Sequence, residues 1–110
     1  SARAVDQLLR AEKWDGDSAQ PNPSLLYDPP IDEFSVLVTI LEKDAKCSEQ
    51  RGVQGPSIVL AYEGSGTLHA DGKTHALRPG VVLYVAAGTP LALSTDDRLL
   101  VARAFLELAP

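Results

Sequence analysis

The residues from Gly55 to Gly88 read GPSIVLAYEGSGTLHADGKTHALRPGVVLYVAAG and are the part of this 110-residue chain that decides its fold. Short segments rich in Val, Leu, Ile and Tyr alternate here with turn residues, which lie at Glu63–Gly66, Asp71–Gly72, Pro79–Gly80 and Ala87–Pro90. Apolar runs separated by turns about every eight residues are typical of consecutive antiparallel strands. This stretch therefore predicts a small all-β barrel or sandwich.

The predicted strands extend to both sides of this stretch. They are Glu33–Glu42, Ser57–Glu63, Thr67–Ala70, Lys73–Leu77, Val81–Val85, Leu91–Ser94 and Leu99–Leu106, and Lys43–Gln54 is predicted as a polar loop. The first of these strands is apolar on both faces, with Phe34, Val36, Val38 and Ile40 on one and Leu37 and Leu41 beside Ser35 and Thr39 on the other. Such a strand is usually covered on both faces, by a second sheet or by another chain.

The N-terminal part is predicted to lie outside the barrel. Residues 1–14 are expected to hold a helix from Ala2 to Lys13, because Val5, Leu8 and Leu9 recur at helical spacing. Residues 15–30 are expected to be an extended, wrapping connector and not an inner strand, since proline removes a backbone donor. Within the connector, anchoring contacts are expected from Leu25, Leu26 and Tyr27. Residues 31–110 are the predicted barrel.

Composition narrows the choice of partners and compartment. Fifteen acidic and ten basic residues give a net charge of −5, and the bases are scattered, which argues against nucleic-acid binding. No apolar run is long enough to span a membrane. Cys47 is the single cysteine, so no internal disulfide can form, and a reducing, cytoplasmic compartment is expected. With polar neighbours and no adjacent histidine, Cys47 is not expected to be a nucleophile.

Two histidines, His69 and His75, flank the turn at Asp71–Gly72. A two-residue hairpin loop would pair His69 with Thr74 and place the two imidazoles on opposite faces, whereas a three-residue loop would set His69 across from His75. In either case two imidazoles are fewer than the three or four protein ligands that zinc requires. We therefore expect exposed hairpin histidines, and no metal ligands in this chain.

Arg103 is the one candidate binding residue. It lies in the otherwise apolar strand Leu99–Leu106, where a charge must reach solvent, pair with a carboxylate or bind a ligand. The first alternative is an ion pair with Glu33 or Glu63, or an edge position from which the side chain reaches water. The second is substrate binding, towards a phosphate or carboxylate. No catalytic residue is expected, because no base, nucleophile and acid are grouped in the pattern.

Four sequence blocks in order carry a family resemblance: LYDPPIDEF at 26–34, GPSIVLAYEGSGTL at 55–68, LRPGVVLYVAAGTPLAL at 77–93 and VARAF at 101–105. Together they resemble the C-terminal domain of type I mannose-6-phosphate isomerase, also called phosphomannose isomerase, over roughly residues 25–106. The resemblance implies a cupin-like, jelly-roll type antiparallel β-barrel. It also implies a zinc-dependent enzyme that interconverts mannose 6-phosphate and fructose 6-phosphate.

The family's functional residues do not carry over to this chain. Its zinc ligands, which are a Gln, two His and a Glu, and its catalytic Arg lie upstream of the domain that the chain resembles. In the second cupin motif, matched by Gly80–Gly88 with Ala86 at the proline position, Leu91 stands where a metal-binding His would be. The His-x-His of the first motif is absent before Glu63–Gly64. We therefore expect a metal-free barrel filled with hydrocarbon side chains.

The resemblance implies a non-catalytic domain that packs against an upstream catalytic domain of the same protein and is inactive alone. In the complete enzyme, a base would move a proton between C1 and C2 of the sugar phosphate while zinc polarises the oxygens. An alternative is a metal-free cupin binding module for a small sugar or sugar acid, with Arg103, Thr39, Tyr62 and Tyr84 as its few polar groups. A self-contained small enzyme is the third possibility, and nothing positions a proton-transfer group for it.

Overall fold

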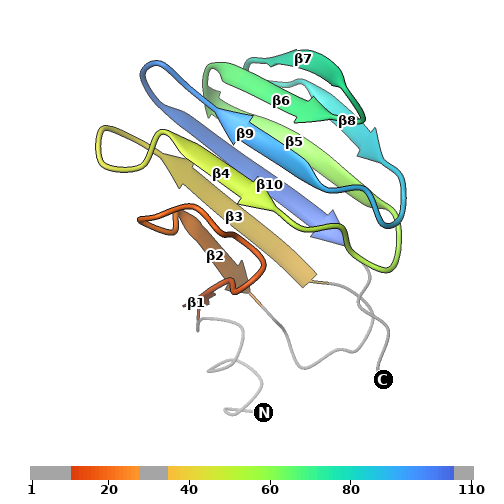
Figure 1. Ribbon diagram of the computed structural model, residues 1–110. Coiled ribbons are helices and arrows are strands. Elements are labelled where there is room, and N and C mark those ends of the chain that lie inside the picture. Colours follow the sequence, from red (N-terminus) through yellow and green to blue (C-terminus); the bar gives the residue numbers. More distant parts are fainter. Residues whose placement is uncertain (1–10, 28–34, 106–110) are drawn as a thin grey trace, which may run out of the picture.

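The computed structural model describes residues 11–27 and 35–105 of the chain, and all of the regular elements in these ranges are strands. They form two antiparallel sheets that pack face to face (Figure 1). One sheet has six strands in the order β1-β2-β3-β10-β5-β8, and the other has four in the order β4-β9-β6-β7. No helix in the described ranges is long and apolar enough to cross a membrane.

The strand bounds are β1 Ala11–Lys13, β2 Ser24–Tyr27, β3 Ser35–Leu41, β4 Cys47–Gln50, β5 Ser57–Gly64, β6 Gly66–Ala70, β7 Lys73–Leu77, β8 Val82–Val85, β9 Leu91–Ser94 and β10 Leu99–Phe105. All the strands predicted from the sequence are present, with ends shifted by one residue at most wherever those ends lie in the described ranges. The two-residue hairpin loop between β6 and β7 is confirmed, since Ala70 pairs with Lys73 and His69 with Thr74. Asp71 and Gly72 both have positive φ, as a type I′ turn requires.

The N-terminal predictions are partly wrong. Residues 2–10 of the expected helix lie outside the described ranges, but its last three residues, Ala11–Lys13, form β1 and pair with β2. The predicted connector contains β2, an inner strand between β1 and β3. Pro21 and Pro23 precede this strand and do not interrupt it, so the amides of residues 24–27 remain available for pairing. The barrel therefore includes residues 11–13 and 24–27, which were expected to lie outside it.

The predicted polar loop Lys43–Gln54 also contains a strand, β4, in which exposed and buried side chains alternate. The segment between β1 and β2 lies along it. Ser18 N donates to Glu49 O and Arg51 N donates to Gly16 O, each at a distance of 3.0 Å. Asp17 forms a β-bridge with Gln50. These bonds hold the 14–23 segment, which we call the N-terminal loop, against the edge of the four-stranded sheet and bring Asp17 into the interior.

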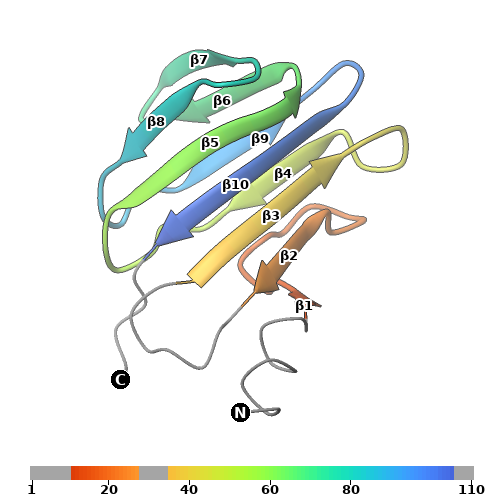
Figure 2. The same ribbon diagram turned by 180° about the vertical axis from the view of Figure 1, so that it is seen from behind.

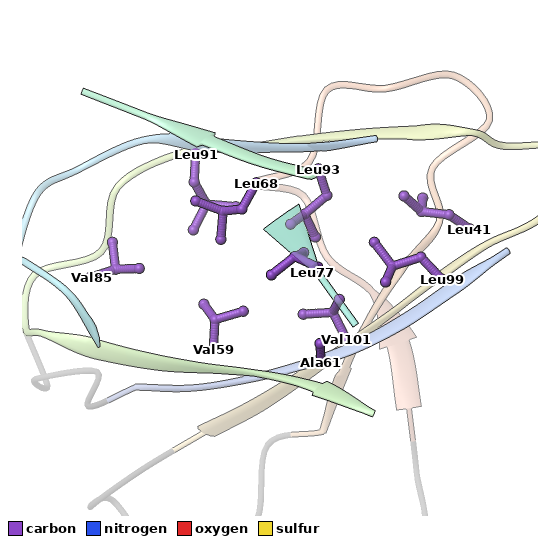
Figure 3. Close-up of a cluster of buried hydrophobic side chains, with 10 residues drawn as sticks. All are labelled: Leu41, Val59, Ala61, Leu68, Leu77, Val85, Leu91, Leu93, Leu99 and Val101. Carbon is purple, nitrogen blue, oxygen red and sulfur yellow. The ribbon is translucent and has the colours of Figure 1, made fainter. Parts of the chain in front are cut away.

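The space between the sheets is divided into an apolar end and a polar end. The apolar end is a cluster of aliphatic side chains contributed by both sheets, which point toward one another in Figure 3: Leu41, Val59, Ala61, Leu68, Leu77, Val85, Leu91, Leu93, Leu99 and Val101. A second, smaller cluster, formed by Trp14, Leu37, Val53 and Phe105, borders the polar end. Burial of these side chains supplies the main favourable free energy of folding.

The outer faces of the two sheets differ in chemistry. On the six-stranded sheet, register pairing aligns two apolar rows across β2, β3, β10, β5 and β8: Leu25, Val38, Ala102, Leu60 and Val82 in one, and Tyr27, Val36, Ala104, Ile58 and Tyr84 in the other. We call these two rows the apolar face. On the four-stranded sheet the corresponding outer positions are mostly polar and include Cys47, Glu49, Thr67, His69, Thr74 and Ser94.

The strand β3 was expected to be covered on both of its faces. Its inward residues, from Ser35 to Leu41, are buried under the four-stranded sheet and the N-terminal loop, whereas Val36, Val38 and Ile40 on the apolar face are half-buried. Among the described residues, therefore, only the inner face of the strand is buried.

Candidate functional site: a buried polar network around Arg103

The polar end of the barrel holds a connected group of buried polar side chains, which we call the polar network. Its members come from the N-terminal loop and from both sheets: Asp17, Ser24, Thr39, Ser48, Gln50, Ser57 and Arg103. The expectation of an interior filled with hydrocarbon is therefore wrong for this end. The physical reason is that buried polar groups are tolerated where they hydrogen-bond one another, and each member of this network has at least one such bond.

Asp17 anchors one side of the network. Its Oδ2 accepts hydrogen bonds from the hydroxyls of Ser24, at 2.6 Å, and Ser48, while its Oδ1 accepts from the backbone amides of Ala19 and Glu49, each at 3.0 Å. Four donors thus surround a carboxylate that is only 4% exposed. This coordination ties together three segments that are distant in the sequence: the N-terminal loop, β2 and β4.

Gln50 links the two sides of the network. Its Nε2 donates to the hydroxyls of Thr39 at 2.9 Å and Ser48 at 3.1 Å, and lies 3.4 Å from that of Ser24. On its other side, its Oε1 accepts from Nη1 of Arg103 at 3.1 Å. An amide suits this position because it presents donors to hydroxyl oxygens and an acceptor to a guanidinium.

Arg103 occupies the other side, at the centre of the six-stranded sheet. The side chain is 2% exposed and crosses the space between the sheets. Its Nε donates to Ser57 Oγ at 3.0 Å, and its Nη1 also lies 3.5 Å from the carbonyl of Arg51. The ring of Phe105 lies 5.8 Å from its guanidinium carbon, within the range of a cation–π contact.

The partners of Arg103 differ from those expected. Glu63 does not pair with it but with the surface residue Arg98, whose Nη1 is 3.4 Å away, and Glu33 lies outside the described ranges. An edge position is also wrong, because β10 lies between β3 and β5. On β5, Glu63 lies toward the opposite end of the strand from Val59, the register partner of Arg103, so its carboxylate is at the far end of the barrel.

Burial lowers the pKa of Arg103 to about 10, and repulsion by the neighbouring Arg51 adds to the effect. The guanidinium therefore remains charged at neutral pH. Its Nη2 is buried and has no hydrogen-bond partner in the part of the chain that the structure describes. The site thus consists of a buried cation held by neutral acceptors, with one donor available to a further acceptor. Such an arrangement can fix the spacing of the two sheets and can in principle bind one oxygen of an anion.

The remaining candidate residues lie elsewhere and are not brought together. His69 and His75 are both exposed, and His69 lies near the hydroxyls of Thr74 and Ser94, at 3.2 and 3.4 Å. Cys47 is exposed on β4. Across residues 11–27 and 35–105, no three His, Cys, Asp or Glu side chains are grouped as a metal site. Leu91, at the position of a motif histidine, packs into the apolar cluster instead.

Inspection of the sequence missed most of the polar network. Asp17 and Ser24 lie in the predicted connector, and Ser48 and Gln50 lie in the predicted polar loop, where polar residues are ordinary. One signal was available in β3, where Ser35 and Thr39 alternate with Leu37 and Leu41 on the buried face. Polar residues at alternate inward positions indicate that something polar faces them across the interior.

Comparison with known proteins now identifies the family. The model for the family described as phosphomannose isomerase type I C-terminal matches residues 24–73, which run from β2 to the start of β7. The mannose-6-phosphate isomerase of Schizosaccharomyces pombe is 46% identical over 88 residues, which are 77% of this chain and 21% of that protein. This chain belongs to the C-terminal domain family of type I phosphomannose isomerases.

A second relative is similar to a larger part of this phosphomannose isomerase domain. The mannose-6-phosphate isomerase of Candida glabrata is 37% identical over 105 residues, covering 92% of this chain and 24% of that protein. The chain thus spans about a fifth to a quarter of the length of these relatives. Among solved structures, a cupin superfamily protein from Desulfitobacterium hafniense superposes with a TM-score of 0.64 at 20% identity, over 76% of this chain and 77% of the other. The expected cupin fold is confirmed.

Proposed function

We propose that this chain is the non-catalytic C-terminal domain of a zinc-dependent mannose-6-phosphate isomerase, an aldose–ketose isomerase acting on mannose 6-phosphate and fructose 6-phosphate. The observation that carries the proposal is that relatives named mannose-6-phosphate isomerase match the chain over only 21% and 24% of their own length. The matching family is moreover described as C-terminal. The catalytic domain in this proposal is the polypeptide that precedes the barrel.

The way the interior is filled supports a non-catalytic role. Leu91 and its neighbours occupy the apolar end, and the hydrogen-bonded side chains of the polar network occupy the other end. The residues of this chain do not fit a zinc site, because His69 and His75 belong to a hairpin that places them on opposite faces. Zinc in the complete enzyme, polarising the oxygens of the substrate, would accordingly be held by the upstream domain.

The test is an isomerase assay on two proteins. We expect the purified 110-residue chain to show no conversion of mannose 6-phosphate to fructose 6-phosphate, with or without added zinc, because residues 11–27 and 35–105 hold no group of side chains that could bind the metal. The matched positive sample is a chimaera in which this chain replaces the corresponding segment of the S. pombe enzyme, and it should be active. Zinc-dependent turnover by the chain alone would refute the non-catalytic assignment. An inactive chimaera would refute the proposal that the chain is a domain of a mannose-6-phosphate isomerase.

A second candidate function is supported by one observation, the unpartnered Nη2 of Arg103. In this alternative, the barrel is a metal-free binding module in which Arg103 binds the carboxylate or phosphate of a small sugar derivative. A thermal-shift titration with mannose 6-phosphate, fructose 6-phosphate and gluconate distinguishes this binding module from the first proposal. A ligand present at about 100 times its Kd should stabilise the fold by roughly 2.7 kcal/mol, and Arg103→Met should abolish that response. The first proposal predicts no response.

The compartment proposed is the cytoplasm, and the support is the free, exposed thiol of Cys47. A fluorescent fusion followed by cell fractionation tests it. Recovery of the fusion in a secretory compartment would contradict it.

A further inference from the structure

The apolar face carries no charge across five strands of the six-stranded sheet, and a charge appears only on the edge strand β1, where Lys13 pairs with Leu25. One of its rows runs through Val38, Ala102 and Leu60, which are direct register partners. The other row runs from β10 to Ile58 on β5 and Tyr84 on β8, and these two residues are also register partners. This is the face turned toward the viewer in Figure 2, in which the six-stranded sheet lies in front of the four-stranded one.

Several of these side chains are strongly exposed. Ile58 is 52% exposed, Tyr84 72%, and the adjacent Tyr62 64%. Antiparallel sheets in which one face meets water normally alternate apolar residues inward with polar residues outward, and the four-stranded sheet does so. The six-stranded sheet departs from that pattern on its outer side. A contiguous exposed apolar patch of this kind marks a surface that another protein surface covers.

The position of the N-terminal strand indicates what covers it. β1 is the edge strand of the six-stranded sheet, next to β2, so any polypeptide that precedes Ala11 joins the barrel at the edge of this sheet and not at the four-stranded one. The relatives carry about three-quarters or more of their length outside the matched segment. A domain connected at this edge can reach the apolar face directly, whereas the polar outer face lies on the opposite side.

We infer that the apolar face is the docking surface for the upstream catalytic domain of the same polypeptide. This inference rests on the proposed function for the identity of the occupant. The contact would be made by apolar side chains of that domain against the two rows, since the face offers no charge to pair with. A second copy of this chain is the competing occupant.

Hydroxyl-radical footprinting with mass spectrometry tests the inference on the isolated chain and on the active chimaera with the S. pombe enzyme. We expect Tyr62 and Tyr84 to be labelled in the isolated chain and to lose labelling in the chimaera. His69, on the polar outer face, should be labelled equally in both. Sedimentation of the isolated chain should show a monomer at the labelling concentration.

A pair of substitutions supplies the matched control. In the chimaera, Ile58→Lys should restore labelling of Tyr84, whereas Ala92→Lys on the outer face of the four-stranded sheet should leave Tyr84 protected. Circular dichroism of both variants in the isolated chain verifies that the barrel still folds. If Ile58→Lys unfolds the chain, Val82→Lys on the edge strand β8 replaces it.

The outcomes separate the two proposals. Full labelling of Tyr84 in an active chimaera would overturn the docking surface and leave the proposed function standing. Protection of Tyr84 in an inactive chimaera would support docking and reject the isomerase assignment. If Tyr84 is already protected in the isolated chain and the isolated chain sediments as a dimer, a second copy covers the apolar face. That result would overturn the inference.

Discussion

Arg103 is a cation whose hydrogen-bond acceptors in the described structure are all neutral. Gln50 and Ser57 accept its hydrogen bonds, and the carbonyl of Arg51 lies at the limit of bonding distance. Burial without a carboxylate partner makes the charged form less favourable in the folded state, which is why its pKa falls to about 10. The residue links the sheets through directional bonds, at the cost of a desolvated charge.

We predict that Arg103→Met lowers the free energy of unfolding by about 1–3 kcal/mol, because the acceptors on Gln50 and Ser57 lose their buried donor. Because the pKa of Arg103 is lower in the folded state than in the unfolded state, the free energy of unfolding of the wild type rises only as the pH passes above the folded-state pKa. The difference between wild type and variant should therefore be constant from about pH 6 to 9 and should increase only above about pH 10. Urea denaturation at several pH values measures it. The surface control Arg98→Met should cost no more than about 1 kcal/mol.

Gly64 is constrained by its backbone and by its neighbour. Its φ is +78°, and an added Cβ would collide with the carbonyl of Arg98, next to its register partner Leu99. Gly72 has a similar φ of +71° but open space around it. Gly72→Ala should therefore show the conformational cost alone, roughly 1–2 kcal/mol, and Gly64→Ala should cost more. If Gly64→Ala and Gly72→Ala lower the urea midpoint equally, the collision at Gly64 must be relieved by a movement of strand β10.

At the scale of elements, the N-terminal loop behaves as part of the barrel. Its backbone pairs with β4 through Gly16 and Ser18, and its buried Asp17 meets hydroxyls from β2 and β4. Trp14, at its start, is 2% exposed and packs at 6.2 Å from the ring of Phe105. The loop closes the polar end, so the network and the loop depend on each other.

Replacement of Asp17 by Asn should therefore destabilise the whole barrel. One Asn oxygen cannot replace both carboxylate oxygens toward four donors, and the amide group would face donors instead of acceptors. We expect a loss of about 1.5–3 kcal/mol, the range for buried hydrogen bonds to a charged group. Asp15→Asn in the same loop is the control, because that side chain is 92% exposed, and it should stay within about 0.5 kcal/mol. Protease cleavage within residues 15–23 should increase only for the first variant.

At the scale of the whole molecule, the two faces of the six-stranded sheet differ: residues on its inner face stabilise the fold, and those on its outer face contribute little. Inward residues such as Leu93 and Val101 fill the apolar end, while the apolar face leaves Ile58 and Tyr84 exposed. Exposed apolar area contributes little to the stability of the isolated chain. Its free energy becomes available only when a second surface covers it.

We therefore expect opposite results from two truncations. Leu93→Ala, at a buried position, should lower the free energy of unfolding of the isolated chain by about 2–5 kcal/mol. Tyr84→Ala should change it by less than about 1 kcal/mol, the size of one cross-strand contact with Ile58. Thermal and urea denaturation of the isolated chain measure both. A large loss from Tyr84→Ala would show that the apolar face already stabilises the isolated fold.

The parts of the fold predicted well are those in which local pattern and tertiary environment agree. The hairpin at Asp71–Gly72 and the strands after Gly55 follow from turn residues and apolar runs. The strands β1, β2 and β4 were missed because they are three or four residues long and lie among polar residues and prolines. They are strands because neighbouring strands supply their hydrogen-bond partners, which local propensity does not reveal.

For the candidate site, the sequence singled out Arg103 because a charge among apolar neighbours is conspicuous wherever it lies. Its partners could not be predicted, since Gln50 and Ser57 are far from it in the chain and were ordinary polar residues until the sheets packed.

By itself the sequence determined the turns, the all-β class and the family, because those depend on residue type and order along the chain. Only the tertiary structure decided that the interior has a polar end, that Asp17 and Arg103 are joined through Gln50, and that apolar residues of five strands form continuous rows on one outer face. Each of these depends on which strands become neighbours, and that is set by packing between residues distant in sequence.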